Sequence, residues 1–345
     1  MIIIKGQQAI DGKENVIHLD IYVDEAKQIK YNGLKMETIT YIMLLAVPTD
    51  KKYIMFNRLN NARCLNPDNQ LGFSVCDKKC DYHHKNNSEI HYNEINQGNS
   101  RIKKNIAERW INILLDNNFK NENAIYFNIL GIIENNIDLE LFGNKKHSNM
   151  YSRFFRTNLL RLLRMFDKYD TIIIENIYHD KTNEMEQHKY FKTNAIQKIK
   201  NNSYKNDRIK FCAESIEFID SKHYKSDKPI ESQFIQFVDL ILGVTVNVIH
   251  NNASTDSKKY LSNLIYPLIF RIIDSNYCKN KNSKYNYFNK QAISFFPKLS
   301  KEEIISKYAN IDEKCIDMLL SISSNFDNNK EILFKEDLGQ QLSFF

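Results

Sequence analysis

Apolar and polar residues alternate with a period of two near the start of the chain, across residues 16–23. Positions 17, 19, 21 and 23 carry Ile, Leu, Ile and Val, while the residues between and after them are mostly polar. This is the period of a half-buried β-strand. Residues 16–23 are therefore predicted to be a strand, and any fold assigned to the chain has to contain a sheet.

The elements that follow alternate between strands and helices. Apolar patterns predict strands at 38–47, 52–56, 171–178 and 216–219, and a strand or buried segment at 124–133. Helices are predicted at 102–115, 150–166, 191–199 and 231–250. Residues 57–99 are polar and irregular, and 261–325 is mostly helical in pattern with a Phe-Phe-Pro break at 295–297. This order indicates an α/β or α+β fold rather than a helical bundle.

Composition narrows the classes of protein to consider. Six cysteines in 345 residues are too few for a disulfide scaffold. No apolar run reaches the roughly 20 residues of a membrane span, and the first residues lack a secretory signal, so we expect a cytosolic protein without a membrane segment. Nine glycines and no Gly-rich phosphate motif disfavour P-loop and dinucleotide-binding folds. The net charge of +6 is compatible with nucleic acid as a partner.

The helix predicted at 150–166 is the clearest amphipathic segment. Its apolar side chains share one broad face, with Leu160 as the exception, while Arg153, Arg156, Arg161 and Arg164 occupy a separate arc. Two interpretations stay open: a solvated helix face, or a stripe that follows the phosphates of a nucleic acid.

Acidic residues at the ends of separate elements are the main candidates for chemistry. Asp24 ends the first strand, Asp180 follows the strand at 171–178, and Asp239 lies in the helix at 231–250. On that helix Asp239 belongs to a polar stripe that also contains Ser232, Gln236, Gly243, Asn247 and His250. Two hard cations need several oxygen ligands from separate elements. These acids therefore have the chemistry of a two-metal site, or else are surface caps and turns.

Three short motifs surround these acids. Residues 22–27 read Tyr-Val-Asp-Glu-Ala-Lys, residues 218–222 read Phe-Ile-Asp-Ser-Lys, and residues 236–243 read Gln-Phe-Val-Asp-Leu-Ile-Leu-Gly. They resemble motifs of the bacterial domain-of-unknown-function 3800 family, which has an RNase H-like fold. The family's first strand ends in Asp-Glu-Ser-Gly, so Ala26-Lys27 departs from the pattern. Asp180 sits where the family has its middle acidic strand end, and Glu89 resembles a further acidic motif.

The resemblance spans roughly residues 16–250 and implies an α/β fold, an RNase H-like mixed sheet flanked by helices. We predict a domain at 1–255 with a polar insertion around 57–99, followed by a helical C-terminal region at 256–338 and a flexible tail at 339–345. Asp24, Asp180 and Asp239 would hold two Mg²⁺ or Mn²⁺ ions, with Glu89 as a further catalytic acid and Asp20 and Glu175 as reserves. Residues expected to contact the substrate are Gln236, Ser221, Lys222, Arg153, Arg161 and Arg164.

Cysteine and histidine residues crowd the polar segment at 57–99. Cys76, Cys80 and His83 have the residue types of a zinc site, with Cys64 or His84 as a fourth ligand. Their spacing matches no standard zinc ribbon or finger, so free thiols in a flexible insertion are the preferred interpretation.

The chain ends in Gln341-Leu342-Ser343-Phe344-Phe345, which resembles the bacterial sliding-clamp-binding pentapeptide. Leu342, Phe344 and Phe345 would enter an apolar pocket of the clamp while Gln341 bonds to its rim. The alternative is a tail that packs on its own domain.

Taken together, the sequence predicts a divalent-metal-dependent nuclease that hydrolyses phosphodiester bonds in nucleic acid, with defence or DNA repair as plausible settings. Two alternatives stay open. One is a non-catalytic RNase H-like module that binds nucleic acid or protein, and the other is an accessory protein whose main role is docking on the sliding clamp.

Overall fold

The computed structural model describes residues 14–32, 35–64, 88–95, 101–119, 122–181, 186, 191–202, 207–222, 227–250, 252–273 and 290–296. The zinc candidates Cys76, Cys80 and His83 and the clamp-motif residues Gln341, Leu342, Phe344 and Phe345 lie outside these ranges. Both sites therefore remain predictions from the sequence.

The strands form one mixed, seven-stranded sheet in the order β5-β4-β1-β2-β3-β7, and β6 pairs with β4 further along the same edge. Strand β2 runs antiparallel to its neighbours β1 and β3, while the other pairings are parallel. The strand bounds are β1 Val16–Asn32, β2 Lys35–Pro48, β3 Tyr126–Ile133, β4 Thr171–Asp180, β5 Ile209–Phe211, β6 Glu217–Ile219 and β7 Gln291–Phe296.

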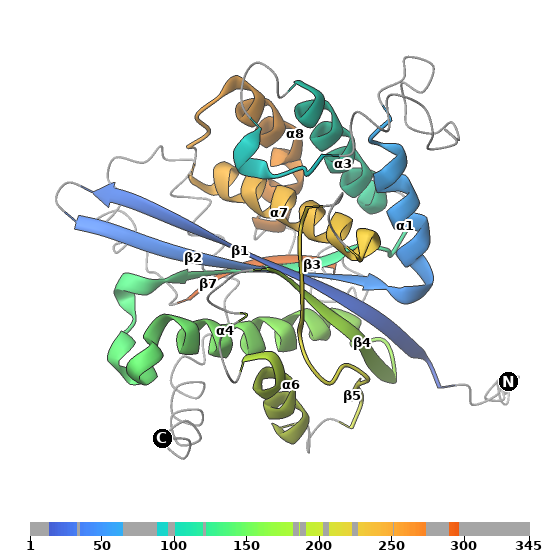
Figure 1. Ribbon diagram of the computed structural model, residues 1–345, viewed down its shortest axis with the longest axis vertical. Helices are drawn as coiled ribbons and strands as arrows, with labels where there is room; N and C mark the ends of the chain where they lie inside the picture. The colour runs from blue at the N-terminus through green and yellow to red at the C-terminus, as the bar shows by residue number, and fades with distance from the viewer. Residues whose placement is uncertain are drawn as a thin grey trace, which may run out of the picture.

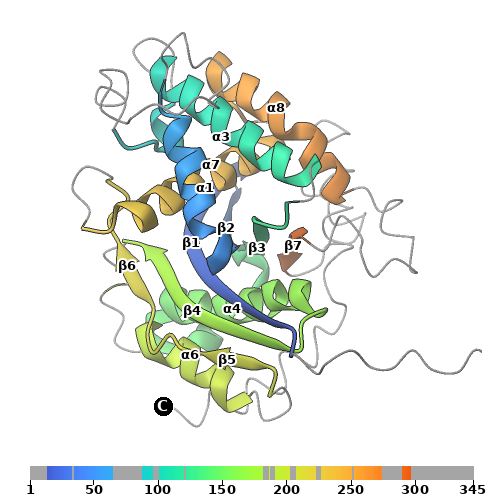
Figure 2. The same ribbon diagram turned by 90° about the vertical axis from the view of Figure 1, so that its right-hand side faces the viewer.

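Helices cover both faces of the sheet. The α-helices are α1 Thr49–Asn61, α3 Arg101–Phe119, α4 Lys146–Leu163, α6 Phe191–Asn202, α7 Pro229–His250 and α8 Asp256–Ile273. Short 3₁₀ segments are η2 Tyr92–Glu94, η3 Glu134–Asn136, η4 Leu139–Lys145 and η5 Arg164–Phe166. In Figure 1 α1, α3, α7 and α8 lie over one face and α4 and α6 over the other, and Figure 2 shows the same three layers from the side. The α/β fold class expected from the sequence is confirmed.

The sheet separates two hydrophobic cores, because successive side chains of a strand point to opposite faces. On β1, Leu19, Ile21 and Val23 belong to the core on the α4 side. Tyr22 belongs to the other core, where its ring stacks on Phe234 of α7 at 4.6 Å between centroids. The alternation at residues 16–23 therefore corresponds to the two faces of the sheet, with even-numbered β1 residues facing α7.

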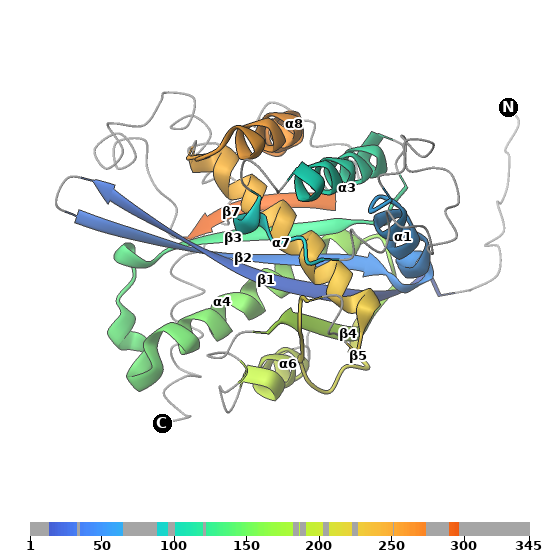
Figure 3. The ribbon, with the colours of Figure 1, turned by 45° about the horizontal axis from the view of Figure 1, so that its top comes forward.

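Helix α7 crosses the sheet at the centre of its layer (Figure 3). By length and composition alone its 22 residues could cross a membrane, although polar residues such as Gln236 and Asp239 interrupt every apolar run in the helix. In the most apolar 18-residue window, 89% is buried inside the structure. This burial is that of a core helix packed on a sheet.

Two expectations about secondary structure were wrong. Residues 52–56 form part of helix α1, not a strand: Met55 and Leu59, four residues apart, are buried, whereas Tyr53 and Ile54 are exposed. A five-residue apolar run does not distinguish the two periods. Because α1 extends to Asn61, the first residues of the expected polar insertion are helical as well.

The second error concerns the C-terminal region, which is not wholly helical. Helix α8 is present, but residues 291–296 form β7, which pairs in parallel with β3. The predicted boundary after residue 255 therefore does not separate β7 from the sheet. Nothing in the residue pattern at 291–296 indicates a pairing with β3, which is more than 150 residues away in the chain.

A buried ion-pair network ties the sheet to two helices. Lys52 of α1 lies 2.9 Å from Asp20 of β1 and 2.8 Å from Glu231 of α7, and Asn176 donates a 2.8 Å hydrogen bond to Asp20. The hydrogen bonds and negative charges around Lys52 outweigh its burial and raise the pKa of its ammonium group. Asp20, a reserve ligand, is thus occupied in holding α1, α7 and β4 together.

Gly131 on β3 leaves space for Phe295 on β7. A Cβ atom at residue 131 would lie 2.6 Å from Cε1 of Phe295 and 2.9 Å from Cε1 of Tyr41. We predict that Gly131→Ala lowers the free energy of unfolding by about 1–3 kcal/mol through overpacking. Urea denaturation checks this. In a Phe295→Ala background, the loss of unfolding free energy caused by Gly131→Ala should be smaller by at least about 1 kcal/mol. If the losses from the two substitutions simply add, the proposed contact between residues 131 and 295 is contradicted.

Candidate functional site

Asp24 and Asp180 lie on neighbouring strands and on the same face of the sheet. The parallel register pairs Tyr22 with Tyr178, whose rings stack at 5.3 Å, and both side chains face the α7 layer. Residues two positions further along each strand share that face. Asp24 and Asp180 therefore point toward α7, at the point where β4 ends and the β1–β2 hairpin continues (Figure 1).

Asp239 comes to the same place from α7. Its Oδ2 accepts a 2.6 Å hydrogen bond from the backbone N–H of Tyr92 and lies 3.1 Å from Nδ1 of His91. The negative charge of Asp239 acts on both Asp24 and Asp180, raising the pKa of each. The three aspartates expected from the sequence thus lie close enough to interact electrostatically.

Burial and mutual repulsion shape the protonation of this group. Burial, followed by the charges of Asp239 and Asp180, raises the pKa of Asp24 well above its ordinary value. Burial and then Asp239 raise the pKa of Asp180 to about 7, with smaller contributions from Glu25 and Glu89. Hydrogen bonds from backbone N–H groups offset part of both shifts. The cluster therefore favours binding of protons or cations.

Among the described residues, His91 is the cationic side chain that forms an ion pair with this cluster, through Asp239. Its hydrogen bond to Asp239, opposed in part by burial, raises the pKa of the imidazole to about 9. His91 is consequently protonated at neutral pH and offsets one carboxylate charge. The sequence pattern alone gave His91 no role beside the aspartates, because its contact with Asp239 joins residues 148 positions apart.

Glu89 joins the cluster from the segment that precedes η2. Its Oε1 accepts a 2.6 Å hydrogen bond from the Ser221 hydroxyl, and its charge raises the pKa values of Asp180 and His91. Ser221 was expected to contact substrate, but here its hydroxyl holds Glu89. Lys222 is exposed, and its backbone N–H donates to Asp220.

Gln236 has a structural role instead of the expected substrate contact. It is 1% exposed; its Oε1 accepts from Ile90 N–H and from the guanidinium of Arg63, and its Nε2 donates to the carbonyl of Ser221. The reason is its place on the polar stripe of α7, which packs against residues 88–95 rather than solvent. Gln236 thereby holds the two segments that carry Glu89 and Ser221.

Arg63 supports the same arrangement and was missed by sequence reasoning. The side chain is 1% exposed, bonds Gln233, Gln236 and the carbonyl of Ser88, and lies 5.0 Å from the ring centroid of Trp110. Burial lowers the pKa of its guanidinium to about 9. An isolated arginine in a polar stretch carries no sequence signal for such a role.

Three further residues of the polar stripe of α7, Gly243, Asn247 and His250, contact residues 88–95 or the sheet. A Cβ atom at Gly243 would lie 2.3 Å from the Tyr92 ring, so only glycine admits this approach. Asn247 donates a hydrogen bond to the Tyr92 hydroxyl, and His250 lies 2.6 Å from the Tyr41 hydroxyl. These contacts of the stripe fix η2 against α7.

A second group of polar residues meets on the opposite face of the sheet. The Tyr151 hydroxyl lies 2.6 Å from Nε2 of His179 and donates a 3.1 Å hydrogen bond to Glu25. His179 is fully buried, and its Nδ1 lies 2.7 Å from the backbone oxygen of Asp180. These contacts fix the end of β4, and the pair His179-Asp180 at a strand end was the signal available in the sequence.

The arginines of α4 are not brought to the aspartates. Arg153 is 5% exposed, with its guanidinium 6.0 Å from the Phe142 ring centroid. Arg161 and Arg164 lie toward and just beyond the C-terminal end of α4, which covers the other face of the sheet (Figure 1). A helical wheel separates the faces of a helix but does not say which face of the sheet the helix covers.

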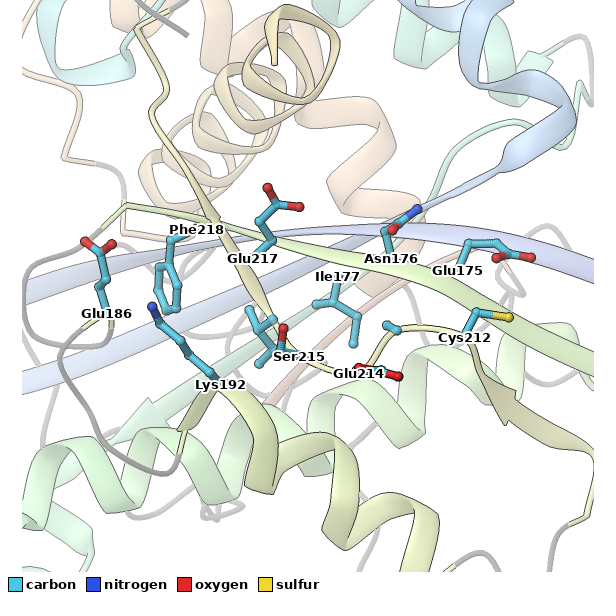
Figure 4. A pocket seen from close by; sticks show the side chains of 12 residues that line it. Glu175, Asn176, Ile177, Glu186, Lys192, Cys212, Glu214, Ser215, Glu217 and Phe218 are labelled. Carbon is cyan, nitrogen blue, oxygen red and sulfur yellow. The ribbon is translucent and has the colours of Figure 1, made fainter. Parts of the chain in front are cut away.

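A pocket of about 500 Å³ opens at the free edge of β4, between β5 and β6 (Figure 4). Its lining includes Glu175, Lys192, Cys212 and Glu217 but none of the three aspartates. Glu175, the second reserve ligand, pairs with His18 at 2.6 Å, and Glu217 pairs with Lys228. The pocket is thus distinct from the aspartate cluster.

Carboxylate oxygens are the ligands that Mg²⁺ and Mn²⁺ prefer, and the raised pKa values of Asp24 and Asp180 show that a cation would relieve repulsion here. Across the described ranges, no three His, Cys, Asp or Glu side chains are already grouped as ligands of one metal ion. The carboxylate oxygens thus suit such ions chemically, but the three side chains would have to move closer together to bind one.

The raised pKa of Asp180 predicts a pH-dependent stability. The pKa of Asp180 is about 7 in the folded protein, compared with an ordinary value of 3.8. The protonated side chain therefore adds to the free energy of unfolding in full below about pH 4, and this stabilisation is lost as the pH rises through 7. In EDTA, the wild type should lose on the order of 1–3 kcal/mol more than Asp180→Asn between pH 4 and 8. Urea denaturation across this range measures the difference. The exposed Asp256→Asn should follow the wild type, and parallel profiles for Asp180→Asn would contradict the assignment.

No family model, curated protein or solved structure matches this chain. The resemblance to the domain-of-unknown-function 3800 family therefore rests on the motifs at residues 22–27, 218–222 and 236–243. What the site does has to be argued from its geometry and charge.

Proposed function

We propose that the protein is a divalent-metal-dependent nuclease with an RNase H-like core. The observation that carries this proposal is that Asp24 of β1, Asp180 of β4 and Asp239 of α7 lie near one another. Their mutual repulsion, together with burial, raises the pKa values of Asp24 and Asp180. Carboxylates crowded in this way, with a single histidine in direct contact among the described residues, favour bound cations.

The strand arrangement supports the RNase H-like part of the proposal. Strands β3, β2, β1, β4 and β5 lie side by side in that order, and β2 alone runs against the others. A mixed sheet with helices on both faces is what the resemblance to an RNase H-like fold implies, so this arrangement is compatible with the proposal. Fold alone does not establish chemistry, so the acids carry the functional argument.

Asp24, Asp180 and Asp239 would hold the ions, which when bound supply an activated water and neutralise charge on the leaving oxygen. The other residues position this group. His91 and the Tyr92 N–H fix Asp239, and Ser221 orients Glu89. A phosphodiester of nucleic acid is the substrate class that suits such a centre.

A non-catalytic module that binds nucleic acid or protein is the second candidate. Within the part of the chain that the structure describes, no three His, Cys, Asp or Glu side chains are arranged to hold one metal ion, which favours this second candidate. The replacement of the family's Ser-Gly by Ala26-Lys27 favours it as well. Cleavage distinguishes the two candidates.

We predict that the wild type cleaves labelled RNA, DNA or RNA–DNA hybrid with Mn²⁺ and that Asp24→Asn and Asp239→Asn each reduce the rate at least about a hundredfold, or roughly 3 kcal/mol. Asp24→Asn removes a buried charge, so the protein should stay folded, which thermal unfolding checks. The exposed Asp50→Asn serves as the matched control and should retain activity. Absence of cleavage by the wild type, or full activity in both variants, would leave the binding module as the better account.

A further inference from the structure

Helix α8 brings a lysine to the aspartate cluster. The helix packs against α7 and α3 (Figures 1 and 2). Its first turn contains Lys258, whose backbone N–H donates a 3.3 Å hydrogen bond to the hydroxyl of Thr255. This cap fixes the position of Lys258 at the end of α8.

The ammonium group of Lys258 lies over the ring of Tyr92, 4.9 Å from its centroid. Tyr92 is the residue whose backbone N–H binds Asp239, and the charge of Asp239 acts on Lys258. Lys258 is therefore placed beside the aspartate cluster by a cation–π contact, an interaction worth about 0.5–1 kcal/mol when partly exposed.

Asp239, whose charge acts on Lys258, and Asp256, in the same turn of α8, form contact ion pairs with other cations. Asp239 pairs with His91 at 3.1 Å, and Asp256 pairs with the neighbouring Lys259 at 4.0 Å. Lys258 itself forms no carboxylate ion pair within 4.0 Å among the residues that the structure covers. A half-buried ammonium group held over an aromatic ring, with its charge uncompensated by direct contact, is suited to bind an incoming anion.

We infer that Lys258 binds a phosphate of the nucleic-acid backbone next to the aspartate cluster, an inference that rests on the proposed nuclease function. A phosphodiester that approaches several carboxylates meets repulsion, and a cation at their edge offsets it. The lysine ammonium acts as a point charge on phosphate oxygens rather than as a reader of bases. The contact is therefore independent of nucleotide sequence.

Salt dependence of binding provides the test. Each phosphate contact contributes about 0.9 to the slope of log affinity against log salt for duplex DNA and about 0.7 for single strands. Binding of short labelled DNA and RNA is measured with Ca²⁺ in place of Mg²⁺. Lys258→Gln keeps most of the stem over Tyr92 and removes the charge, so its slope should be shallower by about 0.7–0.9.

Two controls separate a phosphate contact from general surface charge. Lys258→Arg keeps the charge and should retain the wild-type slope. Lys259→Gln removes the neighbouring, exposed charge, already paired with Asp256, and should change the slope little. Equal slopes for Lys258→Gln and the wild type, with equal thermal midpoints, would overturn the inference. An equal loss in Lys259→Gln would do the same.

The cleavage assay separates this inference from the nuclease proposal. If the wild type does not cleave with Mn²⁺ but Lys258→Gln lowers the slope, the phosphate contact stands and the nuclease proposal fails. If the wild type cleaves and Lys258→Gln leaves the slope unchanged, the nuclease stands and the Lys258 contact fails. Absence of any binding to nucleic acid overturns both.

Discussion

The packing of α7 on the strands β1 and β4 is the interaction on which the site depends. Tyr22 is stacked between Tyr178 of β4 and Phe234 of α7, so the three elements that carry the aspartates are joined by aromatic contacts. The apolar surface of α7 is buried against the sheet, which leaves its polar stripe along one border. That stripe contacts residues 88–95, and this contact places Glu89 and His91 beside the aspartates.

This arrangement concentrates negative charge in a buried place. A hydrophobic core ordinarily excludes carboxylates, and the raised pKa values of Asp24 and Asp180 express the cost of keeping them there. Structural ion pairs in the same protein look different: Asp20 lies next to Lys52 and is directly compensated. Asp24 has no such partner among the described residues. The contrast between these two aspartates of one strand is the physical basis for assigning function to the second.

The sequence predicted local structure well and spatial relations less well. The alternation at 16–23 located the first half of β1, which continues to Asn32. The polar stripe of 231–250 identified the face of α7 that carries Asp239 and packs on residues 88–95. The same patterns could not show that α4 covers the face away from the aspartates, that Gln236 is buried, or that residues 291–296 join β3. Each of these depends on long-range packing. Arg63 and Tyr151 were missed because their partners, Gln236 and His179, are distant in sequence.

The most direct test is a crystal structure of the protein grown with Mn²⁺ and measured for anomalous scattering. We expect manganese peaks between the carboxylates of Asp24, Asp180 and Asp239, with these side chains closer together than in the metal-free protein. Carboxylates that stay apart, with no anomalous peak among them at saturating Mn²⁺, would contradict it.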